Sequence, residues 1–234
     1  LASLIAVDNS AYDFVIHLID SSGSGMRAAF ILAGGVGARL RPHTLVLPKP
    51  LMPSGHEAII ERLLRSVRAA NPQHVTISLG YLGHLVEAVI QDGAALGLKV
   101  SYTREPEPLG TAGALTLLPF DVGDDDVLLI LNGDTLTNIN FDELLSWFEG
   151  TDADAAMVCV SREVLIDFGV VTASADGRLE SISEKPRVTN LLSTGINLIR
   201  GRALRELKPG HTDMPNFLVG LKDSGYTVLC YETD

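Results

Sequence analysis

Cysteine is scarce in this sequence, because Cys159 and Cys230 are the only two among 234 residues. Secreted disulfide frameworks are much denser in cysteine, so we interpret both as reduced core residues of a cytoplasmic protein. Long apolar runs are missing as well. No stretch approaches the roughly 18 residues of a membrane span, and no basic segment precedes the apolar N-terminus as it would in a secretory signal. We therefore expect no membrane partner.

Basic residues are outnumbered by acidic ones. There are 18 Lys and Arg against 29 Asp and Glu, which gives a formal net charge of −11. This is the wrong sign for a surface that must neutralise a nucleic-acid backbone, so no nucleic-acid partner is expected. Small phosphorylated ligands are compatible with this charge, because a few Arg and Lys side chains can converge in one cleft of an acidic surface.

The chain divides at Met26, where a clean strand pattern begins. Residues 1–25 are a short apolar segment followed by a run of serine and glycine. Three alternatives stay open for them: an N-terminal arm, a linker or the end of an upstream module. Residues 26–234 have about the length of one domain, and we expect them to form a single domain.

Apolar periodicity in residues 26–234 predicts an α/β fold. Runs of consecutive apolar residues are typical of strands buried on both faces, and apolar spacings of three and four predict helices. The alternation of the two in the first half predicts a Rossmann-like, doubly wound, mostly parallel sheet, which later strands extend into a mixed sheet. Asn140 is expected to cap the fourth helix. We expect strands at 28–33, 75–79, 99–103, 126–131, 154–160, 168–173, 178–183, 194–199 and 226–231, and helices at 57–70, 82–90, 111–118, 141–148 and 215–224.

The loop after the first expected strand is rich in glycine. Gly34, Gly35 and Gly37 would let backbone N–H groups approach a polyphosphate, and Arg39 would add charge-assisted hydrogen bonds. The loop is neither of the two common phosphate cradles. A P-loop needs Lys-Ser or Lys-Thr after its last glycine, and the dinucleotide fingerprint needs a third glycine where Leu40 stands. A plain turn would explain the glycines alone equally well.

Three further segments carry candidate site residues, two of them directly after strands, where such sheets bind ligands. Lys49 lies between two prolines that hold the backbone rigid, which suits a charge aimed at a phosphate. Gly110 and Gly113 would let a ligand lie against the backbone, and Thr111 is expected to cap the helix that starts there. Asp134 follows a buried strand and suits a Mg²⁺ ion that bridges phosphates.

Together these segments resemble those of the sugar-nucleotide pyrophosphorylases, the nucleotidyltransferases that join a sugar 1-phosphate to a nucleoside triphosphate. Order and spacing agree from about Met26 onward. The matching segments are Gly34-Gly35-x-Gly37-x-Arg39-Leu40-Arg41-Pro42, Pro48-Lys49-Pro50-Leu51, Glu107-Pro108-Leu109-Gly110-Thr111-Ala112-Gly113, Asn132-Gly133-Asp134, Phe168-Gly169-Val170-Val171, Glu184-Lys185-Pro186 and Gly195-Ile196-Asn197.

The resemblance implies the fold of the nucleotide-diphospho-sugar transferases and an in-line attack of the sugar-phosphate oxygen on the α-phosphorus of the triphosphate. It also implies that Arg39, Lys49 and Asp134 are catalytic and that Asp134 holds a Mg²⁺ cofactor. For Glu184 and Lys185, a surface ion pair is the alternative that the residues alone favour. The implied nucleotide site consists of Leu32, Ala33, Gly34, Gly35, Gly37, Arg39, Glu107, Pro108, Gly110, Thr111, Asn132 and Gly133. The implied sugar-phosphate site consists of Gly169, Glu184, Lys185, Ser193 and Gly195.

The sequence departs from this family in three places. Ala38 stands where threonine is usual, and Ser193-Thr194-Gly195 replaces an Asn-Ala-Gly segment that contacts the sugar. The family's second magnesium carboxylate, in a Trp-x-Asp-Ile-Gly-like segment, would lie just beyond Asp234. We therefore expect either a truncated chain or a relative with impaired catalysis, and Asp234 itself is an approximate substitute at best.

Several alternatives stay open for the function. The motifs are most like those of mannose-1-phosphate and heptose-1-phosphate guanylyltransferases, so GTP and mannose 1-phosphate are the first expected substrates. Glucose 1-phosphate with dTTP, CTP or UTP is the alternative. A glycosyltransferase would usually want an Asp-x-Asp pair, which Asp134-Thr135-Leu136 lacks. A non-catalytic nucleotide-sensing subunit is a further alternative, and the sequence leaves open whether the protein is a homo-oligomer.

Overall fold

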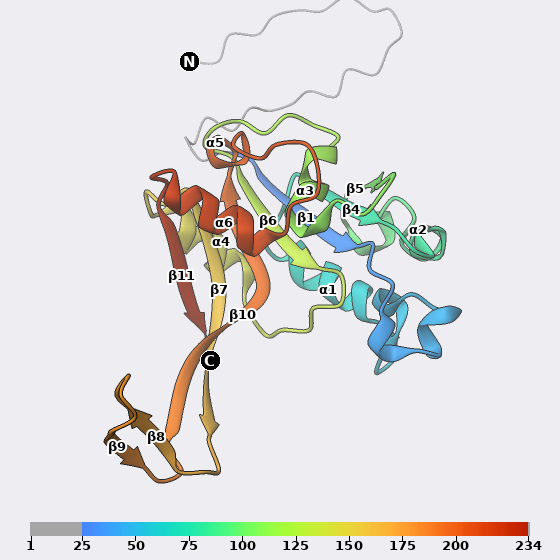
Figure 1. Cartoon of the computed structure of the whole chain (residues 1–234). Helices are drawn as coiled ribbons and strands as arrows, with labels where there is room; N and C mark the ends of the chain where they lie inside the picture. Colours follow the sequence, from blue (N-terminus) through green and yellow to red (C-terminus); the bar gives the residue numbers. More distant parts are fainter. Residues whose placement is uncertain (1–24, 234) are drawn as a thin grey trace, which may run out of the picture.

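The computed structural model describes residues 25–233, so the predictions for residues 1–24 and for Asp234 lie outside it. A seven-stranded sheet forms its centre, in the order β11-β7-β10-β6-β1-β4-β5 (Figure 1). Each pair of neighbours is parallel except for the two pairs made by β10, which runs antiparallel to β6 and β7. The strands are β1 (Arg27–Ala33), β4 (His74–Leu79), β5 (Val100–Arg104), β6 (Val127–Asn132), β7 (Ala155–Leu165), β10 (Arg187–Arg200) and β11 (Val228–Thr233).

Helices cover both faces of this sheet and create two apolar layers. The helices α1 (Ile59–Arg68), α2 (Gly83–Ile90) and α4 (Phe141–Glu149) pack on one face. The helices α3 (Gly110–Gly113), α5 (Gly201–Leu204) and α6 (Met214–Asp223) pack on the other. Strands β1 and β6 are buried on both sides, which is why their apolar residues are consecutive. The predicted single α/β domain with a mostly parallel mixed sheet is confirmed for the described residues.

Short elements account for the boundaries that the sequence analysis missed. The helix predicted at 57–70 begins only at Ile59, because the two residues before it pair with an adjacent segment. The helix predicted at 111–118 is interrupted, since α3 passes into a 3₁₀ turn at Gly113, where glycine favours the helix least. The remaining strands are β2 (Pro53–Ser54), β3 (Glu57–Ala58), β8 (Val170–Ala173) and β9 (Leu179–Ser183). The 3₁₀ turns are Ala38–Leu40, His43–Leu45, Lys49–Leu51, Ala94–Leu96 and Ala114–Leu117.

A long arm leaves the main sheet. We define the arm as residues 161–192, which comprise the far end of β7, the hairpin β8–β9 and the first part of β10. Strand β11 pairs with β7 only as far as Val160, and β6 pairs with β10 only from Asn197 onward. Figure 1 shows the hairpin at the far end of these two strands, apart from the helices. The predicted strands at 154–160 and 194–199 are therefore correct in place and too short.

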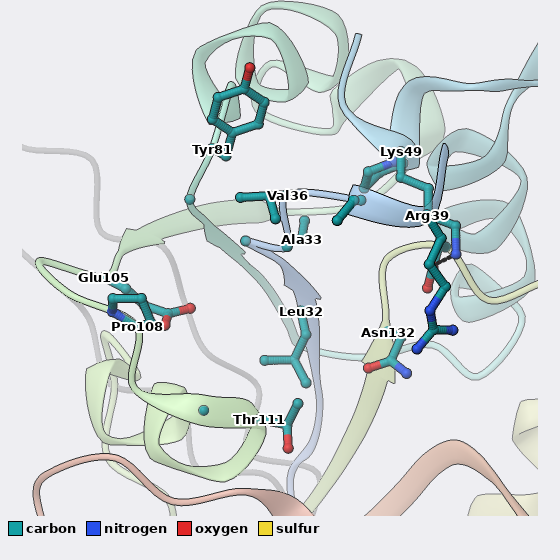
Figure 2. Close-up of a pocket in the computed structure, with 18 of the residues that line it drawn as sticks. Leu32, Ala33, Val36, Arg39, Lys49, Tyr81, Glu105, Pro108, Thr111 and Asn132 are labelled. Atoms are coloured by element: carbon teal, nitrogen blue, oxygen red, sulfur yellow. Dashed lines mark ion pairs between the residues drawn. The ribbon is translucent and has the colours of Figure 1, made fainter. Parts of the chain in front are cut away.

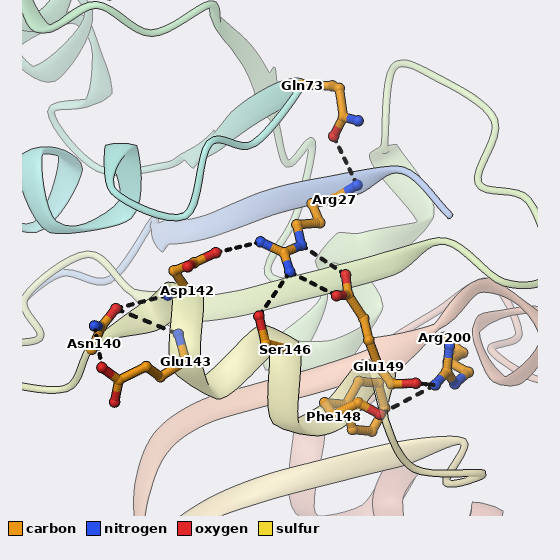
Figure 3. Close-up of polar contacts among 9 residues, drawn as sticks. All are labelled: Arg27, Gln73, Asn140, Asp142, Glu143, Ser146, Phe148, Glu149 and Arg200. Carbon is orange, nitrogen blue, oxygen red and sulfur yellow. Dashed lines mark hydrogen bonds and ion pairs between the residues drawn. The ribbon is translucent and has the colours of Figure 1, made fainter. Parts of the chain in front are cut away.

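Polar contacts fix α4 against the start of β1 (Figure 3). Arg27 donates from Nε to Glu149 at 2.7 Å and from Nη1 to Asp142 at 2.6 Å. The hydrogen bond to Glu149 raises the pKa of the Arg27 guanidinium, against the effect of its partial burial. At the helix start, Asn140 Oδ1 accepts the backbone N–H groups of Asp142 at 3.1 Å and Glu143 at 3.4 Å, which confirms the predicted cap.

Arg200 closes the other end of α4 from inside the core. This residue is 7% exposed, and it donates to the backbone carbonyls of Phe148, Thr151 and Ala153 at 3.2, 3.0 and 2.9 Å. Carbonyls at and just after a helix end have no helical partner, so a buried guanidinium satisfies groups that would otherwise be costly to bury. The guanidinium also lies 5.0 Å from the centroid of the Phe148 ring. The burial of Arg200 is thus explained by the fold.

The two cysteines differ in exposure. Both thiols are free, and Cys159 is buried as predicted. Burial raises the pKa of the Cys159 thiol, and the neighbouring Cys230 thiol raises it further. Cys230 is exposed, so its prediction as a core residue is wrong. It lies on β11, the edge strand of the sheet, where an apolar run is not evidence of burial on both faces. No helix in the described part of the chain is long and apolar enough to cross a membrane.

Candidate functional site

A pocket of about 810 Å³ opens at the carboxyl ends of β1, β4, β5 and β6 (Figure 2). This is the edge at which open parallel sheets bind ligands. Most of the predicted nucleotide and catalytic residues line the pocket, namely Leu32, Ala33, Gly34, Gly35, Gly37, Arg39, Lys49, Glu107, Pro108, Gly110, Thr111, Asn132 and Asp134. Gly133 is not among the lining residues. It is buried and donates its backbone N–H to the carbonyl of Leu32 at 2.8 Å.

The glycine loop after β1 uses its glycines in two ways. A Cβ atom at Gly35 would meet no protein atom within 4 Å, so the fold does not require glycine there and the space is open to a ligand. At Gly37, φ is +57° and a Cβ atom would lie 2.8 Å from Cγ2 of Thr44. Packing and backbone conformation both require glycine at that position. The conformation of the turn therefore explains why residue 37 is glycine, but it does not explain why residue 35 is glycine.

Lys49 and Asp134 form an ion pair at this pocket. Lys49 begins a 3₁₀ turn after Pro48, and Asp134 follows β6. Their side chains keep 40% and 28% of their surface exposed, so ligand oxygens can reach both. Figure 2 shows Lys49 and Arg39 on one side of the pocket, across from Glu105. Two cations beside one carboxylate can bind phosphate oxygens and a metal ion at the same place.

The donor set at Asp134 fits a Mg²⁺ ion that is held largely by its substrate. Among residues 25–233, no group of three or more His, Cys, Asp or Glu side chains could enclose a metal ion. Mg²⁺ takes one or two carboxylates from a protein and completes its shell with phosphate oxygens and water. Asp134 offers one such carboxylate, while Asp234 lies outside the described residues. The Mg²⁺ cofactor stays a prediction.

The glycines of α3 make room for the protein chain itself. Gly110 has φ +76°, and a Cβ atom there would lie 2.5 Å from the carbonyl oxygen of Thr212. A Cβ atom at Gly113 would meet the same loop at 2.4 Å. The prediction that Thr111 caps α3 is wrong, because its Oγ1 accepts the backbone N–H of Met214 at 2.7 Å, at the start of α6. These residues join α3 to α6, and only Gly110 and Thr111 also line the pocket.

Glu105 is a pocket residue that the sequence analysis missed. Its Oε1 accepts a hydrogen bond from Ser78 Oγ at 2.9 Å, and its Oε2 accepts the backbone N–H of Leu109 at 2.9 Å. These contacts fix the carboxylate, and each oxygen keeps a lone pair for a ligand. Glu105 follows directly on β5, so its place after a strand was the signal that could have found it. Gly80 and Tyr81, which follow β4, are further lining residues that the sequence analysis missed.

None of the five residues predicted to bind the sugar phosphate lines the pocket, and three of them lie in the arm. Gly169, Glu184 and Lys185 belong to the arm, and Figure 1 shows the hairpin apart from the loops that follow β1. A Cβ atom at Gly169 would lie 3.1 Å from Oε2 of Glu184, so these two are neighbours. Lys185 forms a surface ion pair with Asp167 at 2.8 Å, the alternative that the residues alone favoured for it. Their role at the sugar phosphate stays a prediction.

The other two, Ser193 and Gly195, lie at a bulge between the arm and the pocket. The register of β10 against β7 shifts between Ser193 and Asn197. Gly195 has φ +82°, and a Cβ atom there would lie 2.4 Å from Nδ2 of Asn132, which lines the pocket. Thr194 donates from Oγ1 to the carbonyl of Val158 at 2.9 Å. Gly195 therefore lies against the pocket wall, while Ser193 does not line the pocket.

This geometry agrees with the matches to known proteins. The sequence model of the nucleotidyl transferase family matches residues 28–214. The chain belongs to the nucleotidyl transferase family. The match begins within β1 and ends at the start of α6, so it includes both the pocket and the arm.

Two curated relatives of this chain carry a consistent name. The mannose-1-phosphate guanylyltransferase of Mycobacterium tuberculosis is 34% identical over 157 residues, covering 67% of this chain and 44% of that protein. The catalytic subunit beta of the Danio rerio mannose-1-phosphate guanylyltransferase is 32% identical over 185 residues, covering 77% of this chain and 51% of that protein. The chain spans about half the length of the curated relatives it matches.

Solved structures confirm the fold of this chain. A putative glucose-1-phosphate thymidylyltransferase from Bacillus anthracis superposes with a TM-score of 0.71 at 24% identity, covering 89% of this chain and 87% of that one. HddC from Yersinia pseudotuberculosis superposes with a TM-score of 0.67 at 22% identity, covering 89% and 91% of the two chains.

Proposed function

We propose that this chain makes a nucleotide sugar. The phosphate oxygen of a sugar 1-phosphate attacks the α-phosphorus of a nucleoside triphosphate, the bond from that phosphorus to the bridging oxygen breaks, and pyrophosphate leaves. The observation that carries the proposal is the ion pair of Lys49 and Asp134 in a pocket that Gly35 leaves open to a ligand. Membership of the nucleotidyl transferase family supports it.

The charges at the pocket suit this reaction. Transfer of a phosphoryl-type group depends on positioning and charge neutralisation more than on covalent work by the protein. Lys49 and Arg39 bind and neutralise the oxygens of the reacting phosphate, and the loop from Gly34 to Gly37 binds the other phosphates through its backbone N–H groups. Asp134 would hold a Mg²⁺ ion, and the ion would stabilise the negative charge of the phosphates.

We propose GTP as the nucleotide because of the carboxylate of Glu105. Guanine presents two neighbouring N–H donors on its pairing edge, whereas thymine and uracil present one N–H between two carbonyl oxygens. A carboxylate accepts hydrogen bonds and does not donate them, so Glu105 matches the two donors of guanine and repels the carbonyls of thymine and uracil. The names of the curated relatives agree with guanine as the base.

We propose mannose 1-phosphate as the acceptor, on the names of the same relatives. For Gly169, Glu184 and Lys185 to bind this acceptor, the arm would bend toward the pocket. The bulge beside Gly195 is the place for such a bend, because bulges and residues with positive φ reorient a strand without breaking it. We also propose that the protein acts in the cytoplasm, which its two free thiols favour.

Release of pyrophosphate tests the proposal. With Mg²⁺ present, GTP, dTTP, CTP and UTP are each paired with mannose 1-phosphate and with glucose 1-phosphate. We expect release with GTP and mannose 1-phosphate, and a loss of about 1000-fold in Asp134→Ala. Release with another pair of substrates would change the proposed substrates and support the proposed reaction. No release from a chain that still binds GTP would refute catalysis and leave a nucleotide-binding homologue.

Glu105→Gln tests the choice of base separately. The amide keeps the shape of the side chain and its contact with Leu109, and it places an N–H donor where the carboxylate only accepts. We expect kcat/KM for GTP to fall about 10- to 100-fold, the discrimination that a two-hydrogen-bond contact to a base provides. Leu109→Met, next to the pocket and without a polar atom facing a base, is the control. Equal kcat/KM for GTP in Glu105→Gln and the unchanged chain would remove Glu105 from base selection.

A further inference from the structure

Asn197 carries a buried polar atom that the fold does not use. The residue is 5% exposed, and its side-chain Oδ1 has no hydrogen-bond partner among the described residues. On the strands beside it, Asn197 pairs with Ile130 of β6 and Met157 of β7. Both neighbours belong to the apolar layer under α6. An unpaired carbonyl oxygen among apolar side chains is costly, and leucine would fill the same place without that cost.

The position of Asn197 connects it to the pocket wall. Side chains two residues apart on a strand share a face of the sheet, and so do residues directly opposite on neighbouring strands. Because Asn197 lies opposite Ile130, it shares its face with Asn132, two residues farther along β6. Asn132 in turn lies opposite Leu32 of β1, and both line the pocket. Figure 2 shows the Asn132 amide among the pocket side chains.

Gly195 removes the side chain that would separate the two asparagines. The bulge interrupts the alternation of β10 here, but a Cβ atom built on Gly195 would point toward Asn132, and glycine places no side chain there. The Nδ2 atom of Asn132 occupies that space, 2.4 Å from where a Cβ atom of Gly195 would lie. The bulge in β10 ends at Asn197, which is the first residue to pair again with β7. Bulges of this kind redirect side chains next to binding sites.

We propose that Asn197 is a positioning residue for Asn132, and this inference rests on the proposed nucleotide site. When the ligand binds, Oδ1 of Asn197 accepts an N–H of the Asn132 amide across the space above Gly195. This contact turns the carbonyl oxygen of Asn132 toward the pocket, where it accepts a hydrogen bond from a hydroxyl or N–H group of the nucleotide. Asn197 thus acts on nucleotide affinity through Asn132 and does not touch the reacting atoms.

The variant Asn197→Leu tests the proposal in the full chain, with GTP and Mg²⁺ and binding measured by calorimetry. We expect the Kd for GTP to rise about 10-fold, which is the loss of one well-placed hydrogen bond. The melting temperature of the ligand-free protein should stay the same or rise, because the variant removes a buried unpaired oxygen. If the chain turns over, KM for GTP should rise with kcat unchanged, since no group in the reaction has moved.

Two further variants separate positioning from packing. Ile199 is buried on the same face of β10 as Asn197, farther from the pocket. The variant Ile199→Val should lower the melting temperature by about 3 °C without changing the Kd for GTP. Asn132→Ala should weaken GTP binding, and the double variant Asn132→Ala/Asn197→Leu should be no weaker than Asn132→Ala alone. An unchanged Kd in Asn197→Leu, or additive effects in the double variant, would overturn the role of Asn197. Failure of the unchanged chain to bind any nucleotide would refute the proposed function as well.

Discussion

The two regions that the proposed reaction needs are built very differently. The pocket lies at the ends of β1, β4, β5 and β6, and the central residues of β1, β4 and β6 are buried on both faces. The arm has only the paired ends of β7 and β10 and a short hairpin, and nearly all of its residues are exposed. Its apolar side chains are exposed too, Phe168 by 77% and Ile182 by 65%.

This difference decides how precisely each region can position its side chains. The main sheet holds its side chains in place, and the arm holds them less firmly. In the pocket, backbone positions are held by helices on both sides, so charges such as Lys49 and Asp134 meet at a defined point. In the arm, few contacts oppose local motion, and regions of low contact density open first. The nucleotide part of the proposed site is therefore preformed, while the acceptor part depends on where the arm lies.

The sharpest contrast is expected from Lys49. Lys49→Ala removes a cation at the reacting phosphate and should lower kcat about 1000-fold, the range measured for loss of one preorganised electrostatic contact. Pyrophosphate release under saturating substrates measures it. Lys222→Ala is the control, because Lys222 lies on α6 and its one ion pair within residues 25–233 is with its neighbour Asp223. A loss of less than 10-fold in Lys49→Ala would mean that the ion pair with Asp134 is not the centre of the reaction.

The second contrast is one of stability. Arg200→Met keeps much of the side-chain volume and removes the donor to the carbonyls of Thr151 and Ala153, just after α4, at a cost of about 3 kcal/mol. In the arm, Phe168→Ser should change the free energy of unfolding by less than about 0.5 kcal/mol, as exposed sites do. Urea unfolding of both variants measures the difference. Equal losses would show that the arm is packed as firmly as the main sheet.

The smallest expected effect comes from the arm's own charge. Lys185→Ala should raise KM for the sugar phosphate about 10-fold, because one charge-assisted contact is lost, and leave the Kd for GTP unchanged. Steady-state kinetics and calorimetry on the same protein separate the two values. Asp167→Asn, which removes the surface partner of Lys185, is the matched control and should not raise KM. A change in the Kd for GTP in Lys185→Ala would contradict the assignment of nucleotide binding to the pocket and of acceptor binding to the arm.

Much of the pocket could be predicted because local chemistry decides it. Continuous apolar runs favour strands covered on both faces, and residues that follow such strands gather at one edge of the sheet. The place of Asp134 at the pocket follows from this reasoning, and the Asn140 cap follows from the chemistry of its side chain. Glu105 obeyed the same rule and was missed because no short motif singled it out.

The errors lie where tertiary contacts decide the outcome. Thr111 bonds to α6, about 100 residues away in sequence, and no local pattern reports that contact. The apolar residues around Cys230 lie on an edge strand, where only one neighbour covers them. The arm continues β7 and β10 through polar and charged residues, because strand pairing there is set by register and not by burial.

Strand β10 belongs to both regions, since its 14 residues run from the tip of the arm into the centre of the main sheet. Its amide hydrogens should therefore record a gradient of protection along one continuous strand. Exchange should be fastest near Arg187 and should slow stepwise beyond the bulge, reaching the rate of global unfolding at Leu198 and Ile199, which are fully buried. The exchange rates along this one strand would therefore show how far local unfolding extends from the arm into the main sheet without unfolding of the whole domain.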